Sequence, residues 1–201
     1  MRKKSFLTSL SVAWLIATGW TMIKVSAYKM TPGQAATPSR LWPRESEIPR
    51  NAQQATLVLF VHPHCPCTQA TVSELARLMT TLRGQLSARV LFIRPDQFSE
   101  EWVKTELWTE VRRIPGVQTF VDRNGKEAQL FGSFTSGQVF VYAPDGRLMF
   151  EGGITPSRGH EGDSLGVRRI ISWVRTGHAD QAQSAVFGCA LNEKETLHEH
   201  H

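Results

Sequence analysis

A continuous apolar run that leads directly into a segment rich in cysteine and histidine constrains the fold more than any other feature of the sequence. Residues 55–62 read ATLVLFVH, which is typical of a strand buried on both faces of a sheet. Apolar residues then recur at helical spacing from Val72 to Leu82, and Gly84 follows where a helix would end. The pattern therefore predicts a buried strand, a turn rich in ligating side chains and a helix in succession.

The pattern further along the chain predicts one α/β domain over residues 55–177. A second buried strand is expected at 89–93, and 99–113 opens with acidic and closes with basic residues, which favours a helix. Three more strands and a last helix are expected, in VQTFVD, in QVFVYA, in RLMFEGGI after the turn APDG, and at about 163–176. This order predicts a mixed sheet with helices on both faces.

The N-terminal region predicts one transmembrane helix. Residues 5–23 carry no formal charge and approach the roughly 20 residues that cross a bilayer. Because Arg2, Lys3 and Lys4 precede this run, the positive-inside rule places residues 1–4 in the cytoplasm and the domain outside it. A signal peptide cleaved near residues 25–27 is the alternative, although the length of the run favours a retained anchor. We expect a single-pass protein of the bacterial inner membrane, with its domain in the periplasm or otherwise extracytoplasmic.

The remaining segments carry fewer signals. Residues 24–54 are rich in proline without an apolar period, so we expect an extended tether. Residues 178–201 form a predicted tail with Cys189, an odd third cysteine that invites a partner in an exported protein. The net charge is +5, but no Lys/Arg cluster is interleaved with aromatic residues. This composition argues against a nucleic-acid partner.

The segment HPHCPCT, residues 62–68, gathers the candidate chemistry: His62, His64, Cys65 and Cys67. Pro66 suits the first position of a helix, which leaves Cys65 at the N-cap. There the free backbone N–H groups, the helix dipole and a protonated His64 would lower the thiol pKa. Cys65 is therefore the predicted nucleophile.

LVLFVHPHCPCTQ resembles the active-site segment of the thioredoxin superfamily, and this resemblance implies a thioredoxin-like fold. It places Cys65 at the attacking position and Thr68 at the position of the resolving cysteine. Cys67 stands one residue early, so the motif is C-x-C, and a Cys65–Cys67 bond would need an unwound first turn or strain, which makes a disulfide oxidising. The anchor and VDRNGKEAQLFG make the chain resemble the TlpA/ResA-type branch. FGSFTSGQVFVY and GGITPSRGHEGDS resemble the RedB-like proteins within it.

Two further positions follow from the resemblance. The superfamily usually has a cis-proline beside the active cysteine, and Ser136-Gly137 stands at that substrate-facing place. The absence of this cis-proline implies a more open face beside Cys65. It favours the binding of a metal or the reaction of an unusual substrate. The loop after the hairpin carries His160, which we expect to act as a proton shuttle or metal ligand, or simply to be solvated. Ser164 or its neighbour Asp163 is the expected cap of the last helix.

Two functions remain as the main alternatives. The first is a thiol–disulfide oxidoreductase that acts on protein thiols or disulfides without a cofactor, with Cys65 attacking and Cys67 or Cys189 resolving. The second is a copper-binding or copper-delivery protein, because thiolates prefer Cu(I). Its expected ligands are Cys65 and Cys67 with additions from His62, His64, His160 or Cys189. A catalytically inactive interaction domain has the least support.

Overall fold

The computed structural model describes residues 2–179 and 183–191, with the side chains of 2–9 excluded. The charges of the predicted cytoplasmic segment 1–4 and part of the predicted tail, 180–182 and 192–201, lie outside the described residues. The chain divides into two compact units, one ending at Thr31 and the other beginning at Pro32. Each unit is described by itself.

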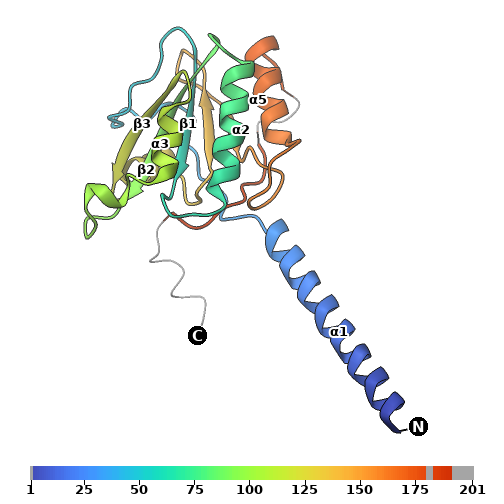
Figure 1. Ribbon diagram of the computed structural model, residues 1–201. Coiled ribbons are helices and arrows are strands. Elements are labelled where there is room, and N and C mark those ends of the chain that lie inside the picture. Colours follow the sequence, from blue (N-terminus) through green and yellow to red (C-terminus); the bar gives the residue numbers. More distant parts are fainter. Residues whose placement is uncertain (1, 180–182, 192–201) are drawn as a thin grey trace. The chain divides into compact units, whose positions relative to one another are not determined.

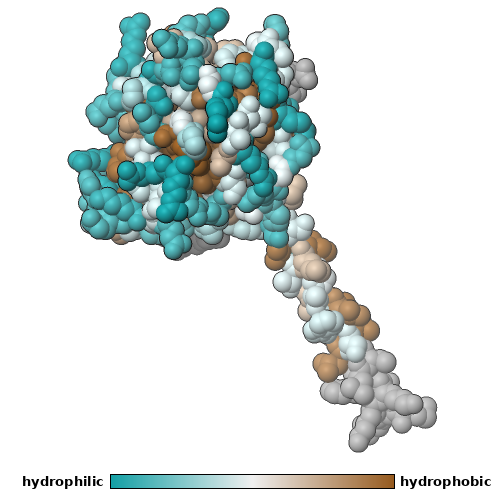
Figure 2. Space-filling model, turned by 45° about the horizontal axis from the view of Figure 1, so that its top comes forward, coloured by the Kyte–Doolittle hydropathy of each residue, from teal (hydrophilic) through white to brown (hydrophobic). Residues whose placement is uncertain are grey.

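The first unit is a single helix, α1 (Arg2–Met30). Its segment Leu10–Met30 is long and apolar enough to cross a bilayer, a test that a signal sequence near an N-terminus also passes. Figure 2 shows apolar residues alternating with paler, less apolar ones along this helix. The uncharged run 5–23 lies within α1, and the helix continues through residues 24–30, where the sequence predicted a tether.

The second unit is built on a five-stranded mixed sheet in the order β3-β2-β1-β4-β5 (Figure 1). The strands are β1 (Ala55–Val61), β2 (Leu86–Arg94), β3 (Val117–Arg123), β4 (Val139–Tyr142) and β5 (Leu148–Gly152). β1, β2 and β3 run parallel, whereas β4 is antiparallel to both β1 and β5. β1 is central and every one of its residues is buried. The predicted thioredoxin-like mixed sheet is confirmed.

The two faces of the sheet are covered differently. One core cluster joins Leu57 and Leu59 of β1 to α2 (Thr68–Thr81), α3 (Glu106–Arg112) and α5 (Leu165–Thr176). The other joins Val58 and Phe60 to the short helix α4 (Lys126–Phe131) and to residues outside the predicted domain, Ile48 and Leu191. Figure 1 shows α2 and α5 side by side on their face. Alternate residues of β1 thus enter separate cores, which explains its uninterrupted apolar sequence.

The structure differs from the predicted extended tether over 24–54. Residues from Pro32 onward belong to the compact unit. Trp42 packs its ring edge-on against Phe131, with centroids 5.1 Å apart. Ser46 Oγ–H donates to Glu127 at 2.6 Å, and Ile48 is buried. The apolar residues in this segment are too widely spaced to show a period, so sequence periodicity could not detect their packing.

Two helices also differ from expectation. The predicted helix 99–113 is split into a 3₁₀ turn, η1 (Glu100–Trp102), and α3, because the Thr105 side chain caps a new helix by accepting from Trp108 N–H. Helix α4 was not predicted. Its first turn is held by the Asp122 carboxylate, which accepts two backbone N–H groups at 2.9 Å. Such a cap stabilises a short polar helix that has no apolar period of its own.

Candidate functional site

The turn between β1 and α2 presents the predicted nucleophile. Cys65 N–H donates to His62 O at 3.1 Å, and Thr68 N–H donates to Cys65 O at 3.1 Å. The second bond spans three residues, so it closes a tight turn, and α2 begins at Thr68 with Cys67 at its N-cap. The predicted N-cap at Cys65 is therefore wrong by two positions. The Cys67 N–H and the Thr68 hydroxyl nevertheless lower the pKa of Cys65, as donors at the start of a helix do.

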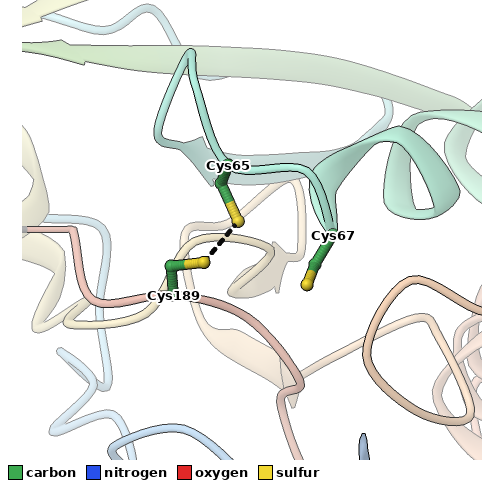
Figure 3. A group of neighbouring side chains, drawn as sticks. All are labelled: Cys65, Cys67 and Cys189. Atoms are coloured by element: carbon green, nitrogen blue, oxygen red, sulfur yellow. Dashed lines mark hydrogen bonds between the residues drawn. The ribbon is translucent and has the colours of Figure 1, made fainter.

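Three thiols meet at this turn. Cys65 and Cys67 come from the turn before α2, and Cys189 comes from the C-terminal segment, with its sulfur pointing toward that of Cys65 (Figure 3). The Cys65 and Cys189 sulfurs lie 2.9 Å apart. All three sulfurs lie within 4.8 Å of one another. Cys65 is buried, the other two are half-buried, and all three are free thiols.

The three thiols have different proton affinities. The hydrogen bond between the Cys65 and Cys189 sulfurs lowers the pKa of Cys65 to about 4 against the opposing effect of burial. The same hydrogen bond raises the pKa of Cys189, and burial adds to the rise. Burial and the negative charge on Cys65 raise the pKa of Cys67. Cys65 is therefore the thiol of the three that loses its proton most readily.

Arg158 belongs to this site although the sequence did not single it out. Its guanidinium donates to Gly188 O, next to Cys189. Its positive charge lowers the pKa of both Cys67 and Cys189, opposing the larger effects that raise them. The arginine lies in the loop after the hairpin, two residues before the predicted candidate His160. In the sequence, the only feature that could have pointed to Arg158 was a positive charge in a glycine-rich loop.

Ser136 and Gly137 join the site to the sheet. Ser136 Oγ accepts from His62 N–H at 2.9 Å and lies 2.9 Å from the Thr68 hydroxyl. Gly137 has a positive φ of 93° and donates its N–H to Phe60 O at 2.8 Å. No cis peptide bond occurs in the described part of the chain. The two residues thus fix the end of β1 and the start of α2 relative to each other.

The histidines lie apart from the three sulfurs. His64 is exposed, and its Nε2–H donates to Trp102 O at 3.0 Å. His62 accepts His64 N–H at its Nδ1, and both rings pack against Trp102. His160 is exposed and donates from Nδ1 to Arg158 O at 2.7 Å. Within residues 2–179 and 183–191, the only group of three or more potential ligands whose donor atoms lie close together is the cysteine group.

The surface beside Cys65 is hollowed on the side of α3. A shallow pocket lies there, bordered by His64, Cys65, Gln69 and Thr105 among others. Cys65 itself is only 5% exposed, and the Cys189 sulfur lies 2.9 Å from its own. The C-terminal segment thus lies directly against the sulfur of the predicted nucleophile.

A scan of the sequence against protein families found no match, and neither did a search of curated proteins. Solved structures do match. A conserved protein from Geobacillus kaustophilus is 18% identical with a TM-score of 0.59, over 82% of this chain and 93% of that protein. A protein from Sinorhizobium meliloti is 20% identical with a TM-score of 0.57, over 80% and 93% respectively. An SCO1/SenC family lipoprotein from Bacillus anthracis is 9% identical with a TM-score of 0.50, over 69% and 96%. At these identities the similarity concerns the fold, and with the strand order it shows that the second unit of this chain has a thioredoxin-like fold.

Proposed function

We propose that this chain is a thiol–disulfide oxidoreductase in which Cys65 attacks and Cys189 resolves. The observation that carries the proposal is the 2.9 Å separation of these two sulfurs. The lowered pKa of Cys65 beside the raised pKa of Cys189 supports the order in which they act. A disulfide between them requires the sulfurs to approach to about 2.05 Å. A thiolate held ready beside a protonated thiol is the arrangement that thiol–disulfide exchange needs.

The reaction proceeds in two exchanges. The Cys65 thiolate attacks one sulfur of a substrate disulfide, whose S–S bond breaks, and the departing substrate thiolate takes a proton from solvent. Cys189 then loses its proton and attacks the Cys65 sulfur, so that a Cys65–Cys189 disulfide forms and the second substrate thiol leaves. The substrate gains two electrons and the enzyme loses two. The same steps in reverse oxidise a substrate dithiol.

The charges around Cys189 determine when this thiol can attack the mixed disulfide. While Cys65 is a thiolate, it raises the pKa of Cys189 and keeps that thiol protonated. Once Cys65 has formed the mixed disulfide its charge is gone, and with it the main cause of that rise. Arg158 remains and favours the Cys189 thiolate. Cys189 therefore becomes more nucleophilic after the first exchange. Cys67 is affected by the same two charges, so the 2.9 Å distance between the Cys65 and Cys189 sulfurs is what favours Cys189 as the resolving thiol.

The test is mass spectrometry of the oxidised, trypsin-digested protein without reduction, together with exchange rates toward oxidised glutathione. We expect a peptide that contains Cys65 to be linked to the one that contains Cys189. The link should persist in Cys67→Ala, and exchange should be lost in Cys65→Ser. A disulfide between Cys65 and Cys67 in the wild type, or undiminished exchange in Cys65→Ser, would refute the proposal.

We also propose that α1 is a single membrane anchor in the bacterial inner membrane and that the domain is periplasmic. Its length, its composition and the basic residues before it support this. The TlpA/ResA-type branch, and the RedB-like proteins within it, is the group we propose for the chain. Membrane fractionation with protease treatment of intact spheroplasts should show a membrane-bound, accessible domain. Soluble protein whose mature N-terminus is Tyr28 would instead indicate a cleaved signal.

Copper binding is the second candidate, favoured by the mutual approach of the three sulfurs within 4.8 Å. Cys65, Cys67 and Cys189 fit the preference of Cu(I) for thiolates in number and kind. Titration of the reduced, anaerobic protein with Cu(I) against bathocuproine disulfonate tests this. Competitive binding that is lost in Cys189→Ala supports the site, and failure to compete excludes it.

A further inference from the structure

The segment that carries Cys189 is bound by backbone hydrogen bonds to residues 134–136, the loop before β4. Ser136 N–H donates to Cys189 O at 2.8 Å, and Leu191 N–H donates to Phe134 O at 2.8 Å. Between these bonds, Thr135 and Ala190 form an antiparallel bridge. This is the backbone pattern by which an extended peptide adds to an exposed edge, with alternate side chains supplying specificity.

The residues on either side of Cys189 fit closely against the surface of the domain. A methyl group on Gly188 would lie 1.8 Å from Ser136 O, a contact with backbone that no side-chain rotation relieves. Two residues after the cysteine, Leu191 is 2% exposed within the second core cluster. The surface therefore accepts a residue without a side chain before the cysteine and a large apolar residue two positions after it.

The segment also places the sulfur of its cysteine where the sulfur of a substrate would lie during exchange. Exchange at Cys65 requires the attacked sulfur to contact the Cys65 sulfur, and Cys189 occupies that place at 2.9 Å (Figure 3). The hydrogen bond from Arg158 to Gly188 O fixes the backbone just before it. The described segment thus has the position and the backbone pairing of a bound peptide.

We propose that residues 186–191 are an internal mimic of the substrate, and that the edge 134–136 binds extended segments of other proteins with the pattern Gly-Cys-x-Leu. This inference rests on the proposed function and narrows its substrate class. Cys189 resolves when its own segment is in place, and a substrate cysteine takes the same place when that segment is displaced.

Binding is tested without any redox step by a fluorescein-labelled peptide, AVFGSALN, in which serine replaces the cysteine. Its anisotropy is followed with the full chain in detergent. The variant Gly188→Ala should expel the internal segment and bind the peptide at least tenfold more tightly than the wild type. Leu191→Glu, which removes the buried anchor, should act in the same direction. Gly19→Ala is the matched control, because a methyl group there meets nothing within 4 Å.

The peptide AVFASALN should bind the Gly188→Ala chain at least tenfold more weakly than AVFGSALN. Circular dichroism checks that each variant is folded. Equal binding of the two peptides would overturn the inference, as would equal binding by the wild type and both expelled variants.

Exchange is then measured with AVFGCALN and AVFACALN, each carrying thionitrobenzoate on its cysteine. The Cys65 thiolate attacks the peptide sulfur, a Cys65–peptide disulfide forms, and thionitrobenzoate leaves as a coloured thiolate. In Gly188→Ala the glycine peptide should react at least tenfold faster than the alanine peptide.

Cysteine–thionitrobenzoate, which has no peptide to dock, separates the two proposals. Reaction with this small disulfide but equal rates for both peptides would refute the substrate class and leave the oxidoreductase intact. Selective binding of AVFGSALN with no exchange by any disulfide would refute the oxidoreductase and leave the peptide site.

Discussion

Removing the Cys189 thiol should raise the pKa of Cys65. The Cys189 thiol lies 2.9 Å from the Cys65 sulfur and is the largest cause of its lowered pKa. A hydrogen bond to a charged group contributes about 1.5–3 kcal/mol, and one pKa unit corresponds to about 1.4 kcal/mol. The variant Cys189→Ala should therefore shift the Cys65 titration upward by about 1–2 pH units. The Thr68 hydroxyl and the Cys67 N–H remain and hold part of the original shift.

The assay is the pH dependence of Cys65 alkylation by iodoacetamide, with the modified residue identified by mass spectrometry. The midpoint of the profile is the quantity compared, because Cys189→Ala also uncovers the sulfur and changes the absolute rate. Cys189→Ser keeps a donor at the same position and should retain most of the lowered midpoint. Cys67→Ala should not raise it. A midpoint in Cys189→Ala equal to or below that of the wild type would show that Cys189 does not stabilise the thiolate.

Three further predictions concern stability, each measured by chemical denaturation. Burial raises the pKa of Asp122 from 3.8 to about 6. The contribution of this carboxyl group to stability is therefore fully present below pH 3.8 and is lost as the pH rises through about 6. The loss should be about 2 kcal/mol between about pH 4 and pH 7, and Asp122→Asn should flatten it; an unchanged slope would contradict the assignment. Trp42→Ala should cost about 2–3 kcal/mol through the lost contact with Phe131, in one cooperative transition, whereas no loss would mean that the segment before β1 is not part of the folding unit. Ser164→Ala should cost about 1 kcal/mol, because its Oγ accepts from Val167 N–H at 3.2 Å at the start of α5, and an equally stable variant would contradict a capping role.

Elements with a strong apolar pattern were predictable from the sequence. The five strands lie where their apolar runs placed them, and α2 and α5 follow their helical spacing. Helix α4 was missed because its stability comes from a carboxylate outside it. The packed segment before β1 was missed because single residues such as Trp42 and Ile48, rather than a repeated pattern, hold it.

The candidate site was predictable only as far as local sequence reaches. The thiol at the strand–helix junction is a local feature, and the sequence placed Cys65 there, although the N-cap lies two residues later, at Cys67. The pairing with Cys189 joins positions 124 residues apart, and no periodicity encodes it, so that cysteine remained one of several alternatives. Arg158 likewise reaches the site only through long-range packing, which brings its guanidinium to Gly188 O.

The distance along the chain between Cys65 and Cys189 also orders events during synthesis. A ribosome completes the strand, turn and helix that carry Cys65 long before it reaches residue 189. Until then Cys65 lacks the thiol that lowers its pKa most, and it behaves more nearly as an ordinary cysteine. A chain cut short before residue 189 would lack the thiol that lowers the pKa of Cys65 most. The full lowering of that pKa is thus reached only in chains that have been made through to their C-terminal segment.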